Sequence, residues 1–235
     1  TLNRVLSEYL GRLDKTITSL SKLNPIFARG GQSRSQVRVI YPHDARQFPP
    51  SVGAGTQALV VTSPPYFNAV DYPRAHRLSV CWMNGYSTPD LVSRKNYVGL
   101  HRAVALDTDS WLRERPACRR LIPLSIREDN ALARRLCGFF NDLQVVLRNT
   151  WTALRPGGHA VFVIANNVIK GNRIASHRIL TLLAQDVGFT EISANARPIE
   201  SARRRFPVGP FGFDGPMTHE YLLVLRKPIR SRLST

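Results

Sequence analysis

Acidic residues are scarce in this chain. Asp and Glu number 16 against 33 Lys and Arg, which gives a formal net charge of +17 over 235 residues. An excess of this size predicts a polyanionic partner, with DNA or RNA ahead of a membrane surface. A generally arginine-rich proteome would give the same charge without such a partner, so the charge indicates a class of partner and no more.

Long apolar runs and paired cysteines are also missing. No stretch of about 18 apolar residues occurs, and no secretory apolar core opens the chain, so neither a transmembrane helix nor a signal peptide is expected. Cys81, Cys118 and Cys137 lack the spacing of a metal site or a disulfide framework. They are expected to be reduced thiols in a cytoplasmic protein. The length and composition predict a single domain, residues 1–235. The first residue is Thr1 and not Met, which favours a fragment of a longer protein.

A short strand followed by a proline loop organises the rest of the sequence. Residues 58–62 are an apolar, β-branched run of the kind that forms a strand buried on both faces. Pro64 and Pro65 cannot continue a sheet ladder, so the strand is expected to stop at Ser63. The loop from Ser63 to Tyr66 then lies at a strand's carboxyl end, where open α/β sheets place their chemistry.

The residue types in this loop suit the recognition of a planar amine. An exocyclic amine of cytosine or adenine is a weak nucleophile because its lone pair is delocalised into the ring. The Ser63 hydroxyl oxygen and the Pro64 carbonyl can each accept one amine hydrogen and so build up electron density on the nitrogen. Proline fixes the backbone beforehand, and Tyr66 could stack on a flipped-out base. A stiff turn without chemistry is the alternative.

This loop resembles the catalytic loop of the amino-methylating DNA methyltransferases, in which Asp, Asn or Ser precedes Pro-Pro and an aromatic residue. A serine in the first place leans toward methylation of cytosine N4, with adenine N6 next. The resemblance implies DNA as the substrate and S-adenosylmethionine as the cofactor. For Asp44, which follows a short strand expected at 37–41, a turn or helix-cap role is the alternative to cofactor binding. The implied catalytic residues are Ser63, Pro64, Pro65 and Tyr66, and the implied cofactor-binding residues are Asp44, Ala45 and Thr62.

The same resemblance implies a nucleic-acid surface around the loop. The residues after Tyr66 are similar to a Tyr-Xaa-Arg-Xaa-His-like segment that follows the loop in this methylase group. Residues 84–130, irregular and rich in Arg, Asp and Pro, are expected to be an insertion that contacts nucleic acid. The alternative to nucleic-acid binding is a position on a helix surface for His76. For the arginines at 203–205 the alternative is a solvated loop. The candidate nucleic-acid-binding residues are Asn68, Asp71, Tyr72, Arg74, His76, Arg203, Arg204 and Arg205.

Hydrophobic periodicity predicts an α/β fold. Helices are expected at 2–23, 132–151 and 174–187, and further strands at 159–165, 189–195 and 219–225. Residues 154–158, Leu-Arg-Pro-Gly-Gly, are similar to the unit before the fifth strand of many S-adenosylmethionine-dependent methyltransferases. With the loop, this implies a class I (Rossmann-like) methyltransferase fold. Its three-layer sandwich is expected to be incomplete and to lack the first two strands.

The glycine-rich cofactor loop of that family occurs nowhere in residues 1–235. It could come from an upstream segment or from a separate partner polypeptide, and the chain alone is expected to bind the cofactor weakly and not to methylate. Two other functions stay open. One is methylation of an RNA base amine, against which Ser63 counts, and the other is nucleic-acid binding without turnover by a methyltransferase-shaped module.

Overall fold

The computed structural model describes residues 44–67, 106–199 and 217–229, and the single residues Asp14, Thr18 and Val98. The chain forms two compact units, Thr1–Pro42 and His43–Thr235. In the first unit, Asp14 and Thr18 are helical, as expected for the helix at 2–23. The strand expected at 37–41 lies outside the described residues. All the elements that follow belong to the second unit.

A mixed four-stranded sheet forms the base of this unit. β1 and β2 run parallel, and β6 runs antiparallel to both of its neighbours, β2 and β5. A short hairpin follows β2 and forms a second, two-stranded sheet. The strands of the main sheet, in spatial order, are β1 (Gln57–Thr62), β2 (Leu154–Ala165), β6 (His219–Arg226) and β5 (Thr190–Pro198), and the hairpin consists of β3 (Asn167–Ile169) and β4 (Asn172–Ile174).

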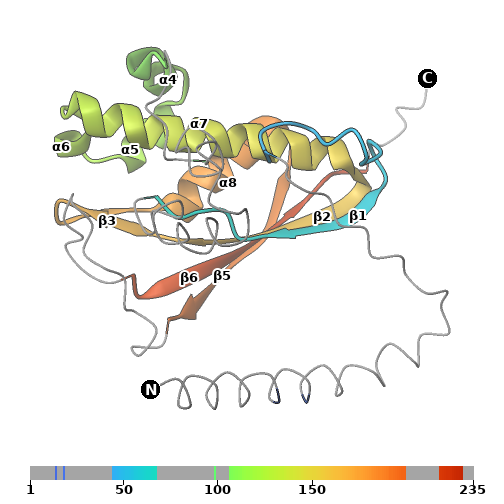
Figure 1. Cartoon of the computed structure of the whole chain (residues 1–235). Helices are drawn as coiled ribbons and strands as arrows, with labels where there is room; N and C mark the ends of the chain where they lie inside the picture. The colour runs from blue at the N-terminus through green and yellow to red at the C-terminus, as the bar shows by residue number, and fades with distance from the viewer. Residues whose placement is uncertain are drawn as a thin grey trace, which may run out of the picture. The chain divides into compact units, whose positions relative to one another are not determined.

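Helices cover one face of the main sheet (Figure 1). The order and direction of the strands, with this helical layer, make a mixed α/β fold, as the sequence predicted. In the described part of the chain it comprises two layers of the expected three-layer sandwich. The helices are α4 (Thr108–Glu114), α5 (Pro116–Leu121), α6 (Leu124–Arg127), α7 (Asn130–Ala153) and α8 (Ser176–Val187).

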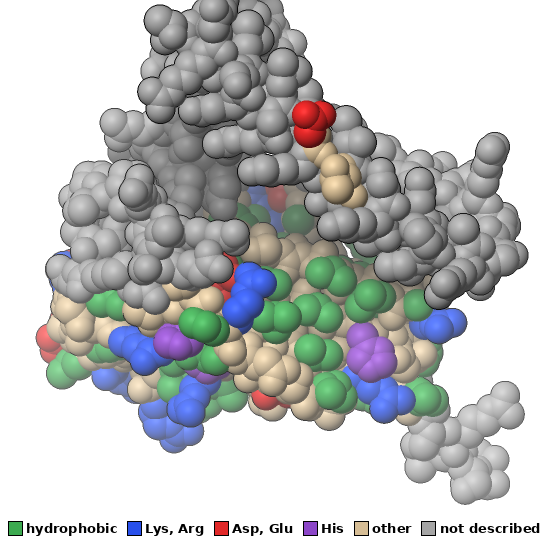
Figure 2. Space-filling model, turned by 90° about the horizontal axis from the view of Figure 1, so that it is seen from below, with side chains coloured by type: hydrophobic (Ala, Val, Ile, Leu, Met, Phe, Trp, Pro, Cys, Tyr) green, Lys and Arg blue, Asp and Glu red, His purple; other side chains and the backbone are tan. Residues whose placement is uncertain are grey.

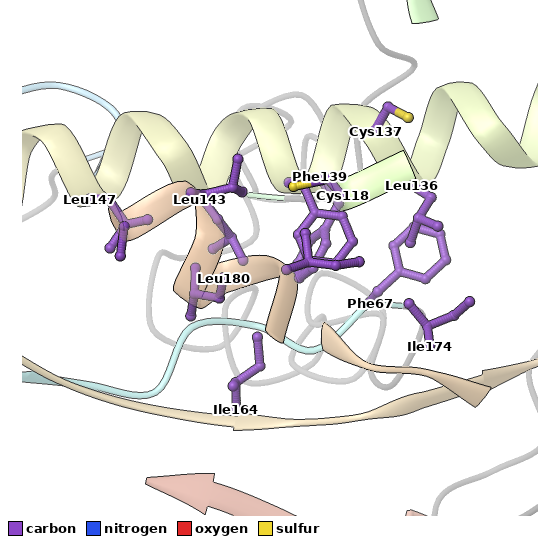
Figure 3. Packing of buried hydrophobic residues seen from close by; sticks show 14 of the residues in the cluster. Phe67, Cys118, Leu136, Cys137, Phe139, Leu143, Leu147, Ile164, Ile174 and Leu180 are labelled. Atoms are coloured by element: carbon purple, nitrogen blue, oxygen red, sulfur yellow. The ribbon is translucent and has the colours of Figure 1, made fainter. Parts of the chain in front are cut away.

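The core lies between α7, α8 and β2. Because strand side chains alternate between faces, Ala160, Phe162 and Ile164 all leave β2 on the helical side, and all are fully buried. The apolar stripe of α7 packs over them, as the helical spacing of its residues predicted (Figure 3). Ile179, Leu180 and Leu183 of α8 complete this core. The α7 residues at its centre are Leu136, Phe139, Phe140, Leu143 and Leu147.

The turn between α7 and β2 requires its two glycines. Gln57 lies opposite Leu154 and Leu59 opposite His159, so β2 carries extra residues that bulge out of the ladder. Gly157 has a φ of 79°, in the left-handed region. A Cβ on Gly158 would lie 2.9 Å from the carbonyl oxygen of Arg155. The strand expected at 159–165 therefore begins earlier, at Leu154.

The irregular structure expected for residues 84–130 is not found in the part that the structure describes. Residues 108–127 form three short helices, α4 to α6, whose apolar side chains belong to the core. Trp111, Cys118, Ile122 and Ile126 are each buried. This segment is thus an integral part of the helical layer.

The prediction that the strand at 58–62 is buried on both faces was also wrong. Leu59 and Val61 of β1 are 55% and 64% exposed. Within the described residues β1 pairs only with β2, and no described helix covers the face to which Leu59 and Val61 belong. Figure 2, seen from that side, shows apolar side chains gathered beside Lys, Arg and His side chains. On the neighbouring strands this apolar face continues with Val161, Val163, Leu222 and Val224, which are half-buried.

Two cysteines are described, Cys118 and Cys137, and both are free and buried. Burial is the main cause that raises the pKa of the Cys118 thiol to about 11 and that of Cys137 to about 12. Both therefore stay protonated at neutral pH and act as core residues. In the described part of the chain, no helix combines the length and apolarity that crossing a membrane requires.

Lys227 should contribute strongly to stability because it caps the end of α7. Its Nζ donates to the carbonyl oxygens of Trp151 (2.7 Å) and Leu154 (2.8 Å) and lies 4.9 Å from the centre of the Trp151 ring. We expect Lys227→Met to lower the free energy of unfolding by about 1–3 kcal/mol, as measured by urea denaturation.

The matched control is Lys170→Met. Lys170 makes an ion pair with Asp129 at 2.7 Å, but its side chain is 57% exposed. Because exposed pairs contribute little, this change should cost much less. Equal losses in the two variants would show that Lys227 acts only as a surface charge.

Candidate active site

The proline loop leaves β1 at the carboxyl edge of the sheet. Ser63 is exposed and its hydroxyl donates a long hydrogen bond, 3.4 Å, to the carbonyl oxygen of Val163 on β2. Pro64 is buried, and Pro65 and Tyr66 are half-buried. The strand ends at Thr62, as the two prolines predicted. The loop therefore presents one exposed hydroxyl on a rigid, partly buried backbone.

Phe67 anchors the end of the loop in the helical layer. It is 1% exposed, and its ring centre lies 5.6 Å from that of Phe139 on α7. The guanidinium of Arg135 lies 5.7 Å from the Phe67 ring centre. Burial lowers the pKa of Arg135 from its usual value. We did not single out Phe67 from the sequence, although a second aromatic residue directly after Tyr66 was a usable signal.

Tyr66 is anchored on the other side of the sheet. Its hydroxyl donates to Oε1 of Glu220 at 3.0 Å, and Oε2 of Glu220 accepts from Arg197. The Tyr66 ring also packs against Ala165 and Met217. Glu220 pairs with Ala165 in the β2–β6 ladder, on the face opposite to the helices. The hydrogen bond joins segments 154 residues apart, so no local pattern could have predicted it.

The turn at residues 44–46 lies against α7. Both carboxylate oxygens of Asp44 accept from the Arg46 guanidinium, the closest contact being 2.6 Å, and Oδ1 also accepts from the Arg46 backbone N–H at 2.9 Å. Arg46 reaches Asp142 of α7 at 3.4 Å, and the Ala45 carbonyl accepts from Asn149 at 2.9 Å. The pKa of Arg46 is raised, mainly by its hydrogen bond to Asp44. These contacts agree with a turn role for Asp44.

The structure separates this turn from the proline loop along α7. Asn149 follows Phe139 by ten residues, which corresponds to about 15 Å along a helix axis. Phe67 contacts the first half of α7, whereas Ala45 contacts its last turns. Thr62, the third candidate cofactor residue, is half-buried in β1 and pairs with Phe162. Ala45 thus lies against the last turns of α7, whereas Thr62 lies in the sheet at the end of β1.

A polar cluster that the sequence analysis missed lies at the carboxyl end of β2. Asn166 Oδ1 and His177 Nδ1 are 2.7 Å apart, which fixes the proton on Nδ1 because an amide oxygen can only accept. The His177 ring stacks on Tyr221, with ring centres 3.8 Å apart and planes within 2°. Arg173 donates to the Tyr221 hydroxyl at 3.2 Å. Asn167, beside Asn166, is 1% exposed and donates to Ser176 at 2.9 Å.

The remaining candidates lie outside the described residues. They are Asn68, Asp71, Tyr72, Arg74, His76, Arg203, Arg204 and Arg205.

Comparison with solved structures gives matches that include three crystal structures of one protein. No protein-family model matches this chain, and no curated protein does. The three are crystal structures of a protein from Thermus thermophilus that is named a putative DNA modification methylase. Its selenomethionine derivative is 20% identical, with a TM-score of 0.40 over 82% of this chain and 53% of that one.

The other two structures match to the same degree. The unmodified protein is 18% identical, with a TM-score of 0.40 over 82% of this chain and 55% of that one. The complex with S-adenosyl-L-methionine is 19% identical, with a TM-score of 0.40 over 82% and 56% of the two chains. This chain spans about half the length of that protein.

Protonation of His177 should destabilise the fold. Burial, followed by the charges of Arg178 and Arg173, lowers the pKa of His177 in the folded chain. The unfolded chain therefore binds the proton more readily, and stability falls as the pH drops through the ordinary histidine range toward the folded pKa. We expect the Tm to fall between about pH 7.5 and about pH 5, and to fall less in His177→Gln.

The control for this experiment is His159→Gln. His159 is half-buried on β2, among the residues that point away from the helices. This variant should keep the pH dependence of the wild type. Equal pH dependence in wild type and His177→Gln would show that His177 is not the responsible group.

Proposed function

We propose that this chain carries the base-binding half of a DNA methyltransferase that acts on an exocyclic base amine, cytosine N4 in the first place and adenine N6 next. The observation that supports this most is the proline loop. It places one exposed hydroxyl, Ser63, on a backbone that Phe67 and Tyr66 hold from opposite sides of the sheet. Preorganised acceptors of this kind are what a weakly nucleophilic amine requires.

The hydrogen bonding of Ser63 suits an acceptor role. Its hydroxyl proton is directed at the carbonyl oxygen of Val163, so the Oγ lone pairs remain to accept an amine hydrogen. The Pro64 carbonyl would accept the second amine hydrogen. Acceptance of both amine hydrogens polarises the two N–H bonds toward the nitrogen, and the added electron density makes its lone pair more nucleophilic. Tyr66 would stack on the base and hold its plane against these two acceptors.

S-adenosylmethionine is the proposed cofactor and would supply the electrophilic methyl group. The described residues fit only part of such a ligand, because both oxygens of Asp44 accept hydrogen bonds from Arg46. The sequence also contains no glycine-rich cofactor loop. We therefore propose that a further polypeptide segment, in the same or another chain, supplies this loop. Within the described residues β1 pairs with β2 alone, so its other edge offers a place for additional strands.

The proposed DNA contacts rest on charge. The net charge of +17 supports a polyanionic substrate, and Arg113, Arg119 and Arg120 of α4 and α5 are exposed. Together with Asn68, Tyr72, Arg74, His76 and Arg203 to Arg205, they are candidates for phosphate and base contacts. RNA would satisfy the same charge requirement, but Ser63 favours a DNA amine over it.

Substitution of Ser63 tests the proposed chemistry. In a preparation that methylates DNA, Ser63→Ala should lower the rate of methyl transfer by roughly 10²-fold, the loss typical of one preorganised polar contact. The affinity for DNA should barely change, since Ser63 is one small side chain on a highly charged protein. Ser125→Ala is the control, because Ser125 is also exposed but lies on α6. Wild-type turnover in Ser63→Ala would exclude the acceptor role.

Titration with the cofactor tests the proposed division of the active site. The 235-residue chain alone should show little or no binding of S-adenosylmethionine by calorimetry, and no transfer of labelled methyl to unmethylated DNA. Addition of a segment that carries the glycine-rich loop should restore both, since a pocket must bury most of a ligand. Methylation by the purified chain without any partner would contradict this division. Binding of DNA without turnover in every combination would support the non-catalytic alternative.

A further inference from the structure

We infer that Glu220 is a positioning residue that fixes the orientation of the Tyr66 ring for base stacking, and that Arg197 holds Glu220 in place. This inference rests on the proposed function of the proline loop and assigns a role to two residues outside it. The three side chains form one connected chain, from the Tyr66 hydroxyl through the Glu220 carboxylate to the Arg197 guanidinium.

The hydrogen bond to Glu220 fixes the far end of the Tyr66 ring. The loop backbone fixes the near end, and Ala165 and Met217 pack against the ring. A phenylalanine in this place would keep the apolar contacts but could rotate away from them. A hydroxyl bound to a carboxylate forms a charge-assisted hydrogen bond, which is stronger and more directional than a neutral one. Glu220 therefore gives a reason for tyrosine at this position.

Arg197 is placed to hold the second oxygen of Glu220. The two residues face each other directly in the β5–β6 ladder. The side chain of Arg197 is 65% exposed, whereas that of Glu220 is 20% exposed. The pKa of Arg197 is raised, mainly by its hydrogen bond to Glu220. With Oε2 bound to Arg197, Oε1 stays directed at Tyr66.

The pair of Arg197 and Glu220 lies close in sequence to the candidate phosphate-binding arginines at 203–205. The next ladder pair is Pro198 with His219, and the Ile199 N–H donates to the Thr218 carbonyl at 2.9 Å. Residues 200–217, which contain the arginines at 203–205, connect the two strands immediately beyond this point. The Tyr66 ring is thus bound to the end of the β5–β6 hairpin at which residues 200–217 connect the two strands.

A double-mutant cycle tests whether Glu220 acts through Tyr66. The variants are Tyr66→Phe, Glu220→Gln and the double variant, in the full chain. Affinity is measured by fluorescence anisotropy with a labelled single-stranded 20-mer of deoxycytidine. If the ring loses part of its stacking, each single change should weaken binding by roughly threefold to tenfold. The double variant should bind no more weakly than the single variants, because both changes remove the same contact.

The matched control corrects for charge. Glu220→Gln also raises the net charge, which by itself strengthens binding to any nucleic acid. Glu191→Gln makes the same charge change on the adjacent strand β5, opposite Leu225 and about 17 Å along the ladder from Glu220. It should bind the oligonucleotide as well as the wild type or slightly better.

An NMR measurement separates this inference from the function on which it rests. In protein with ¹³C-labelled tyrosine rings, the Tyr66 signal is identified by its loss in Tyr66→Phe. It should shift and broaden in Glu220→Gln and in Arg197→Ala, but not in Glu191→Gln. An unchanged Tyr66 signal in Glu220→Gln, or additive losses of affinity, would overturn the positioning role. A shifted signal with wild-type affinity in Tyr66→Ala would overturn the stacking role of Tyr66 instead.

Discussion

The burial of α7 on β2 is the constraint on which the other parts of this unit depend. Its first half supplies Phe139 and Arg135, which receive Phe67 from the proline loop. Its last turn leads into the Gly157-Gly158 bulge, which sets the register of β2 against β1. One helix therefore determines where β1 ends relative to β2, and with that the position of Ser63. Substitutions in the apolar stripe of α7 would therefore displace the proline loop even where the substituted residue makes no contact with it.

The carboxyl edge of the sheet carries two polar networks with different properties. The network of Asn166, His177, Tyr221 and Arg173 lies on the helical side, where ring stacking and hydrogen bonds satisfy its members. The network of Tyr66, Glu220 and Arg197 lies on the opposite side and includes the aromatic residue of the loop that begins at the exposed Ser63. The first network is suited to rigidity and the second to contact with a ligand.

The sequence predicted those elements whose pattern is local. The helical spacing of the apolar residues gave α7 and α8, and the two prolines gave the end of β1. The helices α4 to α6 were missed because four to seven residues are too few for a periodic signal, and Pro116 and Pro123 interrupt them. The burial of Leu59 and Val61 was misjudged because it depends on neighbouring elements and not on the strand itself. The Lys170-Gly171 turn that joins β3 and β4 was a usable signal that we overlooked.

In the candidate site, too, some features followed from the local sequence and others depend on the folded structure. The position of Ser63, Pro64 and Pro65 at a strand end followed from their own chemistry. The partners of Tyr66 and Asp44 could not be predicted, since Glu220 is far away in the sequence and the bonding of Arg46 to Asp44 depends on the fold of the turn. Long-range side-chain pairs are a property of the packed structure, and a single sequence records them only as unconnected polar residues.

Tyr66 and Phe67 are neighbours in sequence but are held on opposite faces of the sheet. Each has its own partner far away in the sequence, so an opening of the segment would break contacts in both places. Release of the segment should therefore require both the core around α7 and the contacts of Glu220 to open. A loop of this kind behaves as part of the cooperative folding unit, and its geometry persists for as long as the fold does.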